Sequence, residues 1–215
     1  MKKWIALTGL MICIFSWLIS CQKETFIESP DARLSISIDT LRFDTVFTTT
    51  GSITGTVKVF NNNDQKLKLS YIRMGGGQAS YFRMNADGTE AQEVQDLEIL
   101  ANDSLYLFVS VTINPNADRL PFLVEDSIII GYNGNEQKIQ LEAFGQNAYF
   151  IRNGLLTTNT QFTNELPYVI LGGLVVDTNI TLTIDKGARL FFHADAPLVI
   201  DGSLKVNGNI QEKVI

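Results

Sequence analysis

Two segments of the chain repeat each other at a constant offset in residue number. "PYVILGGLVVDTNI" (167–180) and "PLVIDGSLKVNGNI" (197–210) are identical at eight of fourteen positions: Pro167/Pro197, Val169/Val199, Ile170/Ile200, Gly172/Gly202, Leu174/Leu204, Val176/Val206, Asn179/Asn209 and Ile180/Ile210. A fixed period in a β-rich stretch indicates a solenoid, in which each coil lays short strands over those of the previous coil. We therefore predict stacked coils over residues 149–215, with like residues over like and with glycines and Asn at corners that need positive φ.

The segment between the two copies supports the same fold. "TLTIDKGARLFFHADA" adds inward apolar positions at Leu182, Ile184, Leu190 and Phe192. "LTIDKGARLFF" followed by "VIDGSLKVNG" resembles the opening coils of right-handed parallel β-helix proteins of Bacteroidota, which implies a parallel β-helix. The alternative is a second small antiparallel β-domain with a chance repeat. Only about one and a half coils of this length are present, so we expect a truncated β-helix at the front of a longer protein.

From Arg33 onward apolar and polar residues alternate, which is typical of strands with one buried and one solvated face. The pattern predicts these inward residues: Leu34, Ile36, Ile38, Leu105, Leu107, Val109, Val111, Ile113, Ile139, Leu141 and Ala143. Turn-rich stretches separate seven to nine such strands, which predicts an antiparallel β-sandwich over residues 31–148. No window has a sustained helical period, so the predicted fold class is all-β.

Several segments of this region follow a known order of elements. They are "FDTVFTTTGSITGTVKVFNNNDQKLKLS", "YFRMNADG", "DSLYLFVSVTINP" and "IQLEAFGQNA". This order is similar to the hydin-type Ig-like domains of secreted bacterial proteins, and the strand that closes on an Asn-rich turn before "LKLS" is its most distinctive part. The resemblance implies an Ig-like fold and no chemistry.

Residues 1–20, "MKKWIALTGLMICIFSWLIS", place two lysines before an uncharged apolar run, as a secretory signal peptide does. The alternative is a retained transmembrane helix, because the run from Trp4 to Ser20 is close to the minimum length for spanning a bilayer. No basic flank follows the run, which favours a cleaved leader.

The tetrapeptide "LISC" resembles the lipobox of bacterial lipoproteins, with Leu18, Ile19 and the small Ser20 before Cys21. The resemblance implies signal-peptidase cleavage after Ser20 and a lipid on the Cys21 thiol, with further acylation of its amine by chains such as palmitate. Each buried methylene contributes roughly 0.8 kcal/mol, so several chains anchor firmly. The other cysteine, Cys13, lies inside the leader, which leaves Cys21 without a disulfide partner.

The residues that follow the lipobox, 21–30, are predicted to be a tether. "QKE" at 22–24 resembles the export signal of surface lipoproteins of some Bacteroidota, and Gln22 is not the aspartate of an inner-membrane retention signal. We therefore expect an outer membrane lipoprotein displayed at the cell surface. A periplasm-facing position stays open, since three residues match readily by chance.

The sequence offers no credible active site or metal centre. His193 is the only histidine, so we expect it to mark a turn in "FFHADAP" rather than to serve as a ligand or base. The acidic pairs Glu125–Asp126 and Asp96/Glu98 are expected to be solvated, and "GGGQAS" to be a mobile loop rather than a phosphate loop. "NNND" and "NADG" match no EF-hand spacing, although weak calcium binding stays open.

These observations predict a non-enzymatic, lipid-anchored cell-envelope protein without a cofactor. Its partners are expected to be the membrane, through Cys21, and a glycan or an envelope protein bound by the sandwich and the β-helix. A net charge of −6 without a Lys/Arg cluster excludes nucleic acid. One alternative is the front fragment of a polysaccharide-active enzyme whose catalytic coils lie beyond Ile215, and another is a scaffold without a ligand.

Overall fold

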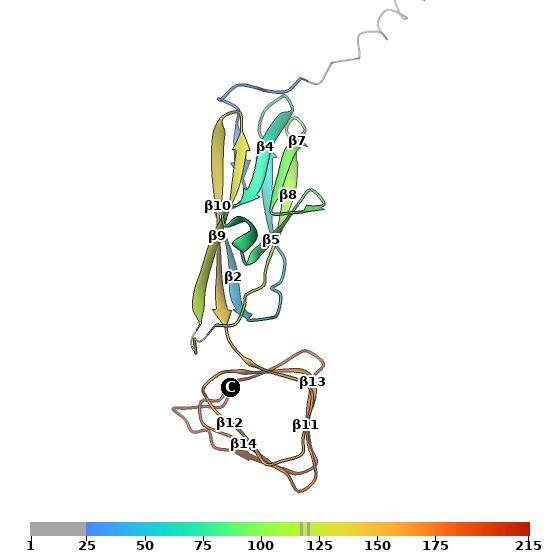
Figure 1. The fold of residues 1–215 in the computed structure, drawn as a ribbon, viewed down its shortest axis with the longest axis vertical. Coiled ribbons are helices and arrows are strands. Elements are labelled where there is room, and N and C mark those ends of the chain that lie inside the picture. Colours follow the sequence, from blue (N-terminus) through green and yellow to red (C-terminus); the bar gives the residue numbers. More distant parts are fainter. Residues whose placement is uncertain (1–24, 117, 120) are drawn as a thin grey trace, which may run out of the picture.

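The computed structural model describes residues 25–116, 118–119 and 121–215, and the fold of this part is all-β (Figure 1). Ten strands form two five-stranded sheets that face each other as a β-sandwich. One sheet has the order β1 (Leu34–Ile36), β3 (Gly55–Asn61), β8 (Ser104–Val111), β5 (Phe82–Ala86), β6 (Thr89–Glu90). The other has the order β2 (Thr40–Phe47), β10 (Asn135–Gln146), β9 (Phe122–Tyr132), β4 (Leu67–Met74), β7 (Glu93–Ile99).

The alternating residues fill the space between the two sheets. All the predicted inward residues of β8 and β10 are buried, and Ile113, just beyond β8, is fully buried. The prediction is wrong for Ile38, which is 37% exposed. The reason is that β1 ends at Ile36 and the chain then crosses to the other sheet, so Ile38 lies on the crossover.

Among the named strands of the sandwich all pairing is antiparallel, as predicted, with one exception. β2 pairs with β10 in parallel, and the register shifts between Ala143 and Phe144. β10 pairs on its other side with β9, antiparallel and without a shift. β2, which follows the crossover from the first sheet, runs in the same direction as β10, the last strand of the sandwich. The alternation of apolar and polar residues within a strand does not determine whether its neighbour is parallel or antiparallel.

The Asn-rich turn after β3 is a buried hydrogen-bonding centre. The Asn61 amide donates to the carbonyl oxygens of Gln65 (2.8 Å), Ile99 (3.1 Å) and Leu100 (2.8 Å). Its Oδ1 accepts from the backbone and side-chain nitrogens of Asn63. These side chains satisfy backbone groups of the turn, which accounts for their burial.

The strands after the sandwich pair in parallel. β11 (Tyr149–Leu156) pairs with β13 (Tyr168–Val176), and β13 pairs with both β15 (Leu190–Phe192) and β16 (Leu198–Ile200). A second parallel sheet has the order β12 (Thr160–Phe162), β14 (Thr181–Ile184), β17 (Ser203–Val206). Together the strands outline a roughly triangular unit (Figure 1). Its interior is a separate apolar cluster that includes Ile170, Leu174, Val176 and Leu182, all fully buried.

One circuit of the chain around this unit is shorter than the offset between the two copies of the repeat. Tyr149 pairs with Tyr168, and Tyr168 pairs with Leu190, so each of these residues lies one circuit after the one before it. Thr160, Leu182 and Leu204 follow one another in the same way, at a constant difference of 22 in residue number. The strands therefore stand at three levels, and the expected one and a half coils were an undercount caused by the wrong period.

The repeat has a different origin from the one predicted. Leu174 in β13 lies shortly before Leu182, which occupies the next side of the unit, and Leu182 pairs with Leu204 one circuit later. Identical residues of the two copies, such as Leu174 and Leu204, thus lie one circuit and one side apart. The prediction that they stack on each other is wrong. Leu174 is fully buried, whereas Leu204 is 43% exposed and follows the buried Leu182 in its row.

The predicted corner residues are confirmed at the bend inside β13. Gly172 and Gly173 have φ of 78° and 123°, a region that favours glycine. Before the bend β13 pairs with β15, and after it with β16, so the two glycines separate two sides of the unit. Asn153 in β11, with φ 46°, lies beside Gly172 and turns the preceding circuit at the same corner.

The sandwich and the triangular unit lie end to end (Figure 1). Residues 26–29 are fixed at the far end of the sandwich, where the Asn133 amide donates to the carbonyls of Ile27 (2.8 Å) and Ser29 (3.0 Å). β10 starts at that end and finishes at the triangular unit. Within the described part of the chain, no helix has the length and apolar character needed to cross a membrane.

Candidate functional site at the junction of the two units

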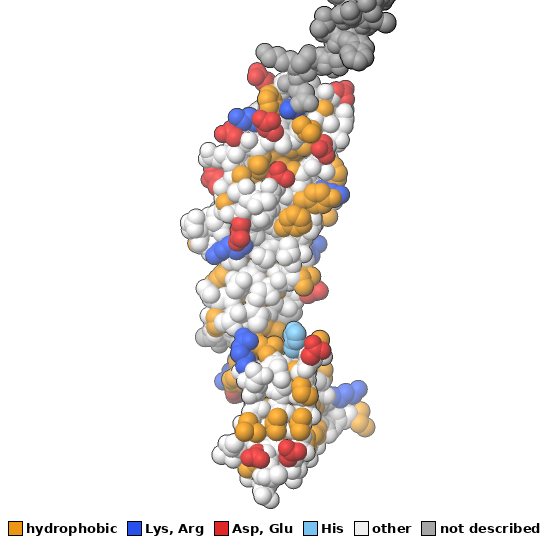
Figure 2. All heavy atoms as spheres, turned by 90° about the vertical axis from the view of Figure 1, so that its right-hand side faces the viewer, with side chains coloured by type: hydrophobic (Ala, Val, Ile, Leu, Met, Phe, Trp, Pro, Cys, Tyr) orange, Lys and Arg blue, Asp and Glu red, His pale blue; other side chains and the backbone are white. Residues whose placement is uncertain are grey.

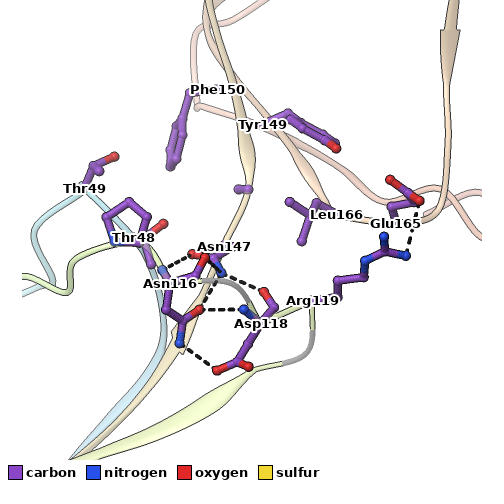
Figure 3. A pocket seen from close by; sticks show the side chains of 12 residues that line it. Thr48, Thr49, Asn116, Asp118, Arg119, Asn147, Tyr149, Phe150, Glu165 and Leu166 are labelled. Atoms are coloured by element: carbon purple, nitrogen blue, oxygen red, sulfur yellow. Dashed lines mark hydrogen bonds and ion pairs between the residues drawn. The ribbon is translucent and has the colours of Figure 1, made fainter.

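A hollow of about 360 Å³ lies where the chain passes from the sandwich into the triangular unit (Figure 3). Four short segments line it: the residues after β2, the β8–β9 connection, the β10–β11 linker and the residues before β13. The labelled lining residues are Thr48, Thr49, Asn116, Asp118, Arg119, Asn147, Tyr149, Phe150, Glu165 and Leu166. Pockets between domains are common positions for ligand sites.

Asn147 organises the sandwich side of the hollow. It is 6% exposed, and its Nδ2 donates to Asn116 Oδ1 (2.7 Å) and to the carbonyl oxygens of Asn116 (3.1 Å) and Asp118 (2.6 Å). Asn116 in turn donates from Nδ2 to the Asp118 carboxylate at 2.7 Å. This network holds the β8–β9 connection against the linker and leaves the Asp118 side chain exposed at the rim.

Among the described residues, an ion pair and an aromatic contact join the sandwich to the triangular unit. Arg119 and Glu165 form an ion pair at 3.2 Å, and the rings of Phe47 and Phe191 lie 5.1 Å apart. The ion pair is largely exposed and contributes at most about 1 kcal/mol. The aromatic contact contributes about 0.5–1.5 kcal/mol beyond its buried area.

Thr49 has an unusual backbone conformation in the wall of the hollow. Its φ is 64°, in the left-handed region that β-branched residues avoid. The turn is held by hydrogen bonds from Thr48 N to Gln146 O (3.0 Å) and from Thr49 N to Ile113 O (2.9 Å). Such a conformation costs about 1–3 kcal/mol, and strained residues of this kind cluster at ligand sites.

The arrangement suits the binding of a polar molecule with an apolar face. Tyr149 is 43% exposed and presents an aromatic ring, while the Asp118 and Glu165 carboxylates and the Arg119 guanidinium supply acceptors and donors. Among the described residues no cluster of three or more His, Cys, Asp or Glu could hold a metal ion.

A second hollow, of about 480 Å³, lies at the other end of the sandwich beside the β9–β10 turn. The Tyr71 ring covers Gly131, whose Cα leaves no room for a Cβ, and the Tyr71 hydroxyl donates to Glu136. That hydrogen bond raises the pKa of Tyr71 above its ordinary value of 10.0. A shift in this direction keeps the phenol protonated at neutral pH, so it does not make Tyr71 a proton-transfer group.

The predicted lipid-attachment residue Cys21 and the cleavage motif Leu18, Ile19 and Ser20 lie outside the described residues. His193 follows β15 in an exposed turn, as predicted, and its backbone carbonyl accepts from Ala196 N at 2.9 Å.

The remaining acidic and turn motifs have structural roles. Asp96 pairs with Lys68 at 2.6 Å, and the hydrogen bond to Asp96 raises the pKa of Lys68. Asp126 accepts from Gly76 N (2.8 Å), and a short 3₁₀ helix covers Gly77–Ala79. "GGGQAS" is therefore a hydrogen-bonded turn, whereas the sequence predicts a mobile loop. In "NADG", Asn85 Oδ1 accepts from Gly88 N at 2.9 Å.

Sequence reasoning missed the junction hollow. Its lining residues come from four separate segments and share no spacing. The only local signal is "GQNAYF", where a polar pair interrupts two strands of strong β character. The pattern marks a boundary there, but it does not say which other segments meet at it.

Comparisons with known proteins give weak structural likeness. No family model matches the chain, and no curated protein matches it. Three solved structures, each 10% identical, resemble part of it. A family 123 glycoside hydrolase from Clostridium perfringens has a TM-score of 0.39, covering 52% of this chain and 25% of that one. A protein of unknown function from Porphyromonas gingivalis W83 has 0.39, with 59% and 60% covered. The ASH/PapD-like domain of human CEP192 has 0.37, with 60% and 94% covered.

The chain therefore spans a quarter and three fifths of the first two structures it resembles. All three TM-scores are below 0.5, so these matches carry no argument about activity. The strand order and the buried alternation themselves define the first unit as an Ig-like β-sandwich, followed by small parallel sheets.

Proposed function

We propose that this chain is a non-enzymatic, lipid-anchored envelope protein in which the sandwich is a spacer and the triangular unit presents a surface for binding a glycan or a protein. The observation that carries the proposal is the end-to-end order (Figure 1). The N-terminal segment is fixed at one end of the sandwich, and the triangular unit follows at the other.

The length of the spacer follows from its longest strand. β10 has 12 residues and runs from the N-terminal end to the junction. At about 3.3 Å per residue it spans about 40 Å. A protein anchored just before the sandwich would thus hold its second unit about that far from the membrane, in addition to the length of the tether.

In this proposal the triangular unit is the start of a right-handed parallel β-helix. Parallel pairing at three levels, circuits of nearly constant length and a glycine corner support that class. A β-helix displays long rows of equivalent side chains, because each circuit adds one residue to each row. Leu155, Val175 and Val199 form such an outward row, and Figure 2 shows rows of hydrophobic side chains on this unit.

We further propose a Bacteroidota-type lipoprotein with a hydin-like Ig-like domain, anchored through Cys21 in the outer membrane and displayed at the cell surface. The support is the sequence: the leader, the lipobox residues Leu18 to Cys21, and "QKE" after them. In this proposal the junction hollow, with Tyr149, Asp118 and Glu165 on its walls, is the candidate binding site between the sandwich and the triangular unit.

The anchor is tested with Cys21→Ser in a native-type host. We expect the wild-type chain to sediment with membranes and to incorporate labelled palmitate, and the variant to lose both properties. A variant that stays membrane-bound would contradict the lipoprotein assignment. Protease treatment of intact cells then separates surface display, where the sandwich is cut, from a periplasm-facing position, where it is protected.

The alternative of a polysaccharide-active enzyme has its own measurement. The purified full chain is incubated with polysaccharides, and new reducing ends or unsaturated ends are assayed. Release of either would overturn the non-enzymatic assignment. Binding without release is the expected result.

A further inference from the structure

Aromatic side chains occupy the outward face of the sheet formed by β1, β3, β8, β5 and β6, which the core does not explain. Tyr106 and Phe108 on β8 are 41% and 42% exposed, and Phe60 on β3 is partly exposed. We call these three residues the aromatic face. β8 is the central strand of its sheet, so the aromatic face lies in the middle of an open surface and not at a sheet edge. Figure 2 shows that hydrophobic side chains also gather in groups on the sandwich.

The two exposed rings have a defined mutual geometry. The centroids of Tyr106 and Phe108 are 6.0 Å apart, and their planes differ by 10°. Lys58, directly opposite Tyr106 on β3, places its Nζ 4.6 Å from the Tyr106 centroid. The cation–π contact restrains the ring and leaves the ammonium protons available to a ligand.

Hydrogen-bonding groups flank the rings on both neighbouring strands. Thr56 and Asn85 lie opposite Phe108 on β3 and β5. Asn85 Oδ1 accepts from Gly88 N, so the carbonyl end of this side chain is occupied and its NH₂ group is the end that can donate to a ligand. Arg83 lies two residues before Asn85 on the same face and is exposed. Its Nη1 donates to the carbonyl oxygens of Ser80 (2.7 Å) and Phe82 (2.9 Å), so only its other guanidinium nitrogens can donate to a ligand.

Charges of both signs border the aromatic face. Neither Lys58 nor Arg83 forms an ion pair with any residue in the described ranges. On the other side, Glu90 lies opposite Asn85 on β6, and Asp87 lies in the β5–β6 turn. An acidic polymer would meet these two carboxylates and a protein of net charge −6. A neutral, hydroxyl-rich chain meets both donors and acceptors.

We propose that the aromatic face binds a neutral polysaccharide chain laid across β3, β8 and β5. The C–H faces of the sugar rings pack on Tyr106 and Phe108, while Lys58, Asn85 and Arg83 donate to hydroxyl oxygens and Glu90 accepts from hydroxyl groups. The inference rests on the proposed glycan-binding function and adds the ligand class and a second surface, whose residues do not line the junction hollow.

A protein partner is the weaker choice for this surface. A stable protein interface buries about 800 Å² per partner around an apolar, largely uncharged centre. Here Lys58 lies among the three aromatic side chains and polar side chains surround them, so the apolar centre is small. A sugar ring requires only one or two aromatic faces and several hydrogen-bonding groups.

The test uses the full lipidated chain in detergent micelles, with hydroxyethyl cellulose, galactomannan and dextran as neutral probes and polygalacturonate as the acidic one. Affinity gel electrophoresis gives the retardation, and calorimetry gives Kd for the probe that binds. We expect a neutral probe to bind, and Tyr106→Thr/Phe108→Thr to weaken that binding at least tenfold. Threonine suits an exposed strand position, so the double variant is designed to keep the fold, and thermal unfolding checks that it does.

Phe144→Thr is the matched control, because Phe144 is a 48% exposed phenylalanine on β10 of the other sheet. Its affinity should stay within twofold of wild type. Unchanged affinity in the double variant overturns the aromatic face as the site, while glycan binding by the chain stands. Preferred binding of polygalacturonate overturns the neutral ligand class. Binding of no probe overturns the inference and the glycan part of the proposed function, and the anchor is still judged by Cys21→Ser. Loss of self-association in the double variant would reassign the face to a second copy of the chain.

Discussion

Asn61 is expected to be the most sensitive polar side chain of the sandwich. It is 1% exposed, and its amide donates to three backbone carbonyls at 2.8–3.1 Å while its Oδ1 accepts twice from Asn63. Asn61→Ala removes all five hydrogen bonds and leaves buried carbonyl and amide groups without partners. The cost of such groups, and not the lost bonds themselves, decides the effect.

The magnitude follows from the number of groups that water cannot reach. The hydrogen bonds from Asn61 Nδ2 to the Ile99 carbonyl and from the Asn63 backbone N–H to Asn61 Oδ1 are both buried, whereas Asn63 Nδ2 keeps its bond to the Arg33 carbonyl in the variant. At about 1–3 kcal/mol for each unsatisfied buried group, two such groups cost about 2–6 kcal/mol. The carbonyls of Gln65 and Leu100 are partly accessible, so water replaces the amide there at little cost. A loss of this size is a large part of the stability of a domain.

Urea unfolding followed by circular dichroism measures the effect on the full chain. With a slope of about 1–3 kcal/mol per M, Asn61→Ala should lower the midpoint of the sandwich transition by about 1 M or more. Asn62→Ala is the matched control, because Asn62 is exposed and makes one side-chain hydrogen bond, to Ser35 Oγ. Its effect should be within about 0.5 kcal/mol. Equal midpoints for the two variants would refute the claim that Asn61 holds the turn.

Two further predictions concern the triangular unit. A Cβ at Gly202 would collide with the carbonyl oxygens of Ile180 and Asp177, so Gly202→Ala should destabilise this unit by about 1–3 kcal/mol. Amide hydrogen exchange should then increase in β16 and β17 but not in the sandwich. Unchanged exchange in β16 and β17 would contradict the close approach of these backbone atoms. The hydrogen bond from Lys186 lowers the pKa of Glu212 below its ordinary 4.5, so the pair stabilises the fold above that pH and loses its effect as pH falls through the lowered pKa. The difference in Tm between wild type and Glu212→Gln should therefore be constant from neutral pH to about pH 5.5 and shrink at pH 3, and a constant difference down to pH 3 would show that the pair is not coupled to folding.

The alternation of the first unit was predictable because each strand has one dry face. In β8 the burial of Leu105, Leu107, Val109 and Val111 follows the period-two pattern without exception. The same pattern fails at Ile38 because a crossover between sheets has no fixed face. It also says nothing about the parallel pairing of β2 with β10, since strand direction depends on chain connectivity and not on side-chain period.

The repeat correctly predicted stacked parallel strands, but with the wrong spacing. Leu174 fills the interior, and Leu204, although 43% exposed, continues the row of the buried Leu182 on another side of the unit. Identity at an offset of 30 was therefore stronger than similarity at the true offset of 22, where "TLTI" lies under "SLKV". Sequence identity at the offset of 30 reflects similar surroundings of the paired positions. The residues that stack on each other are those 22 apart, where the sequences are less alike.

The candidate sites were not predictable for a related reason. At the junction, Thr48, Asn116, Asn147 and Glu165 come together only because β2 and β10 end, and β9 begins, close to the turn before β13. On the sandwich, Tyr106 and Phe108 occupy the outward positions of β8, where their β propensity alone accounts for them in the sequence. Their significance depends on the flanking Lys58, which the pairing of β3 with β8 places beside Tyr106.

How firmly the two units are aligned can be judged from the contacts that cross the junction. β10 ends at Gln146 and β11 begins at Tyr149, so only two residues connect the units and large separations are impossible. The Phe47–Phe191 contact and the exposed Arg119–Glu165 pair together contribute about 0.5–2.5 kcal/mol. That favours the observed alignment by roughly twofold to sixtyfold over bent arrangements that lack both contacts, since about 1.4 kcal/mol corresponds to a factor of ten. The end-to-end alignment is thus favoured without being locked. A molecule that contacts both units in the hollow shifts this equilibrium by the difference between its affinities for the aligned and the bent arrangements.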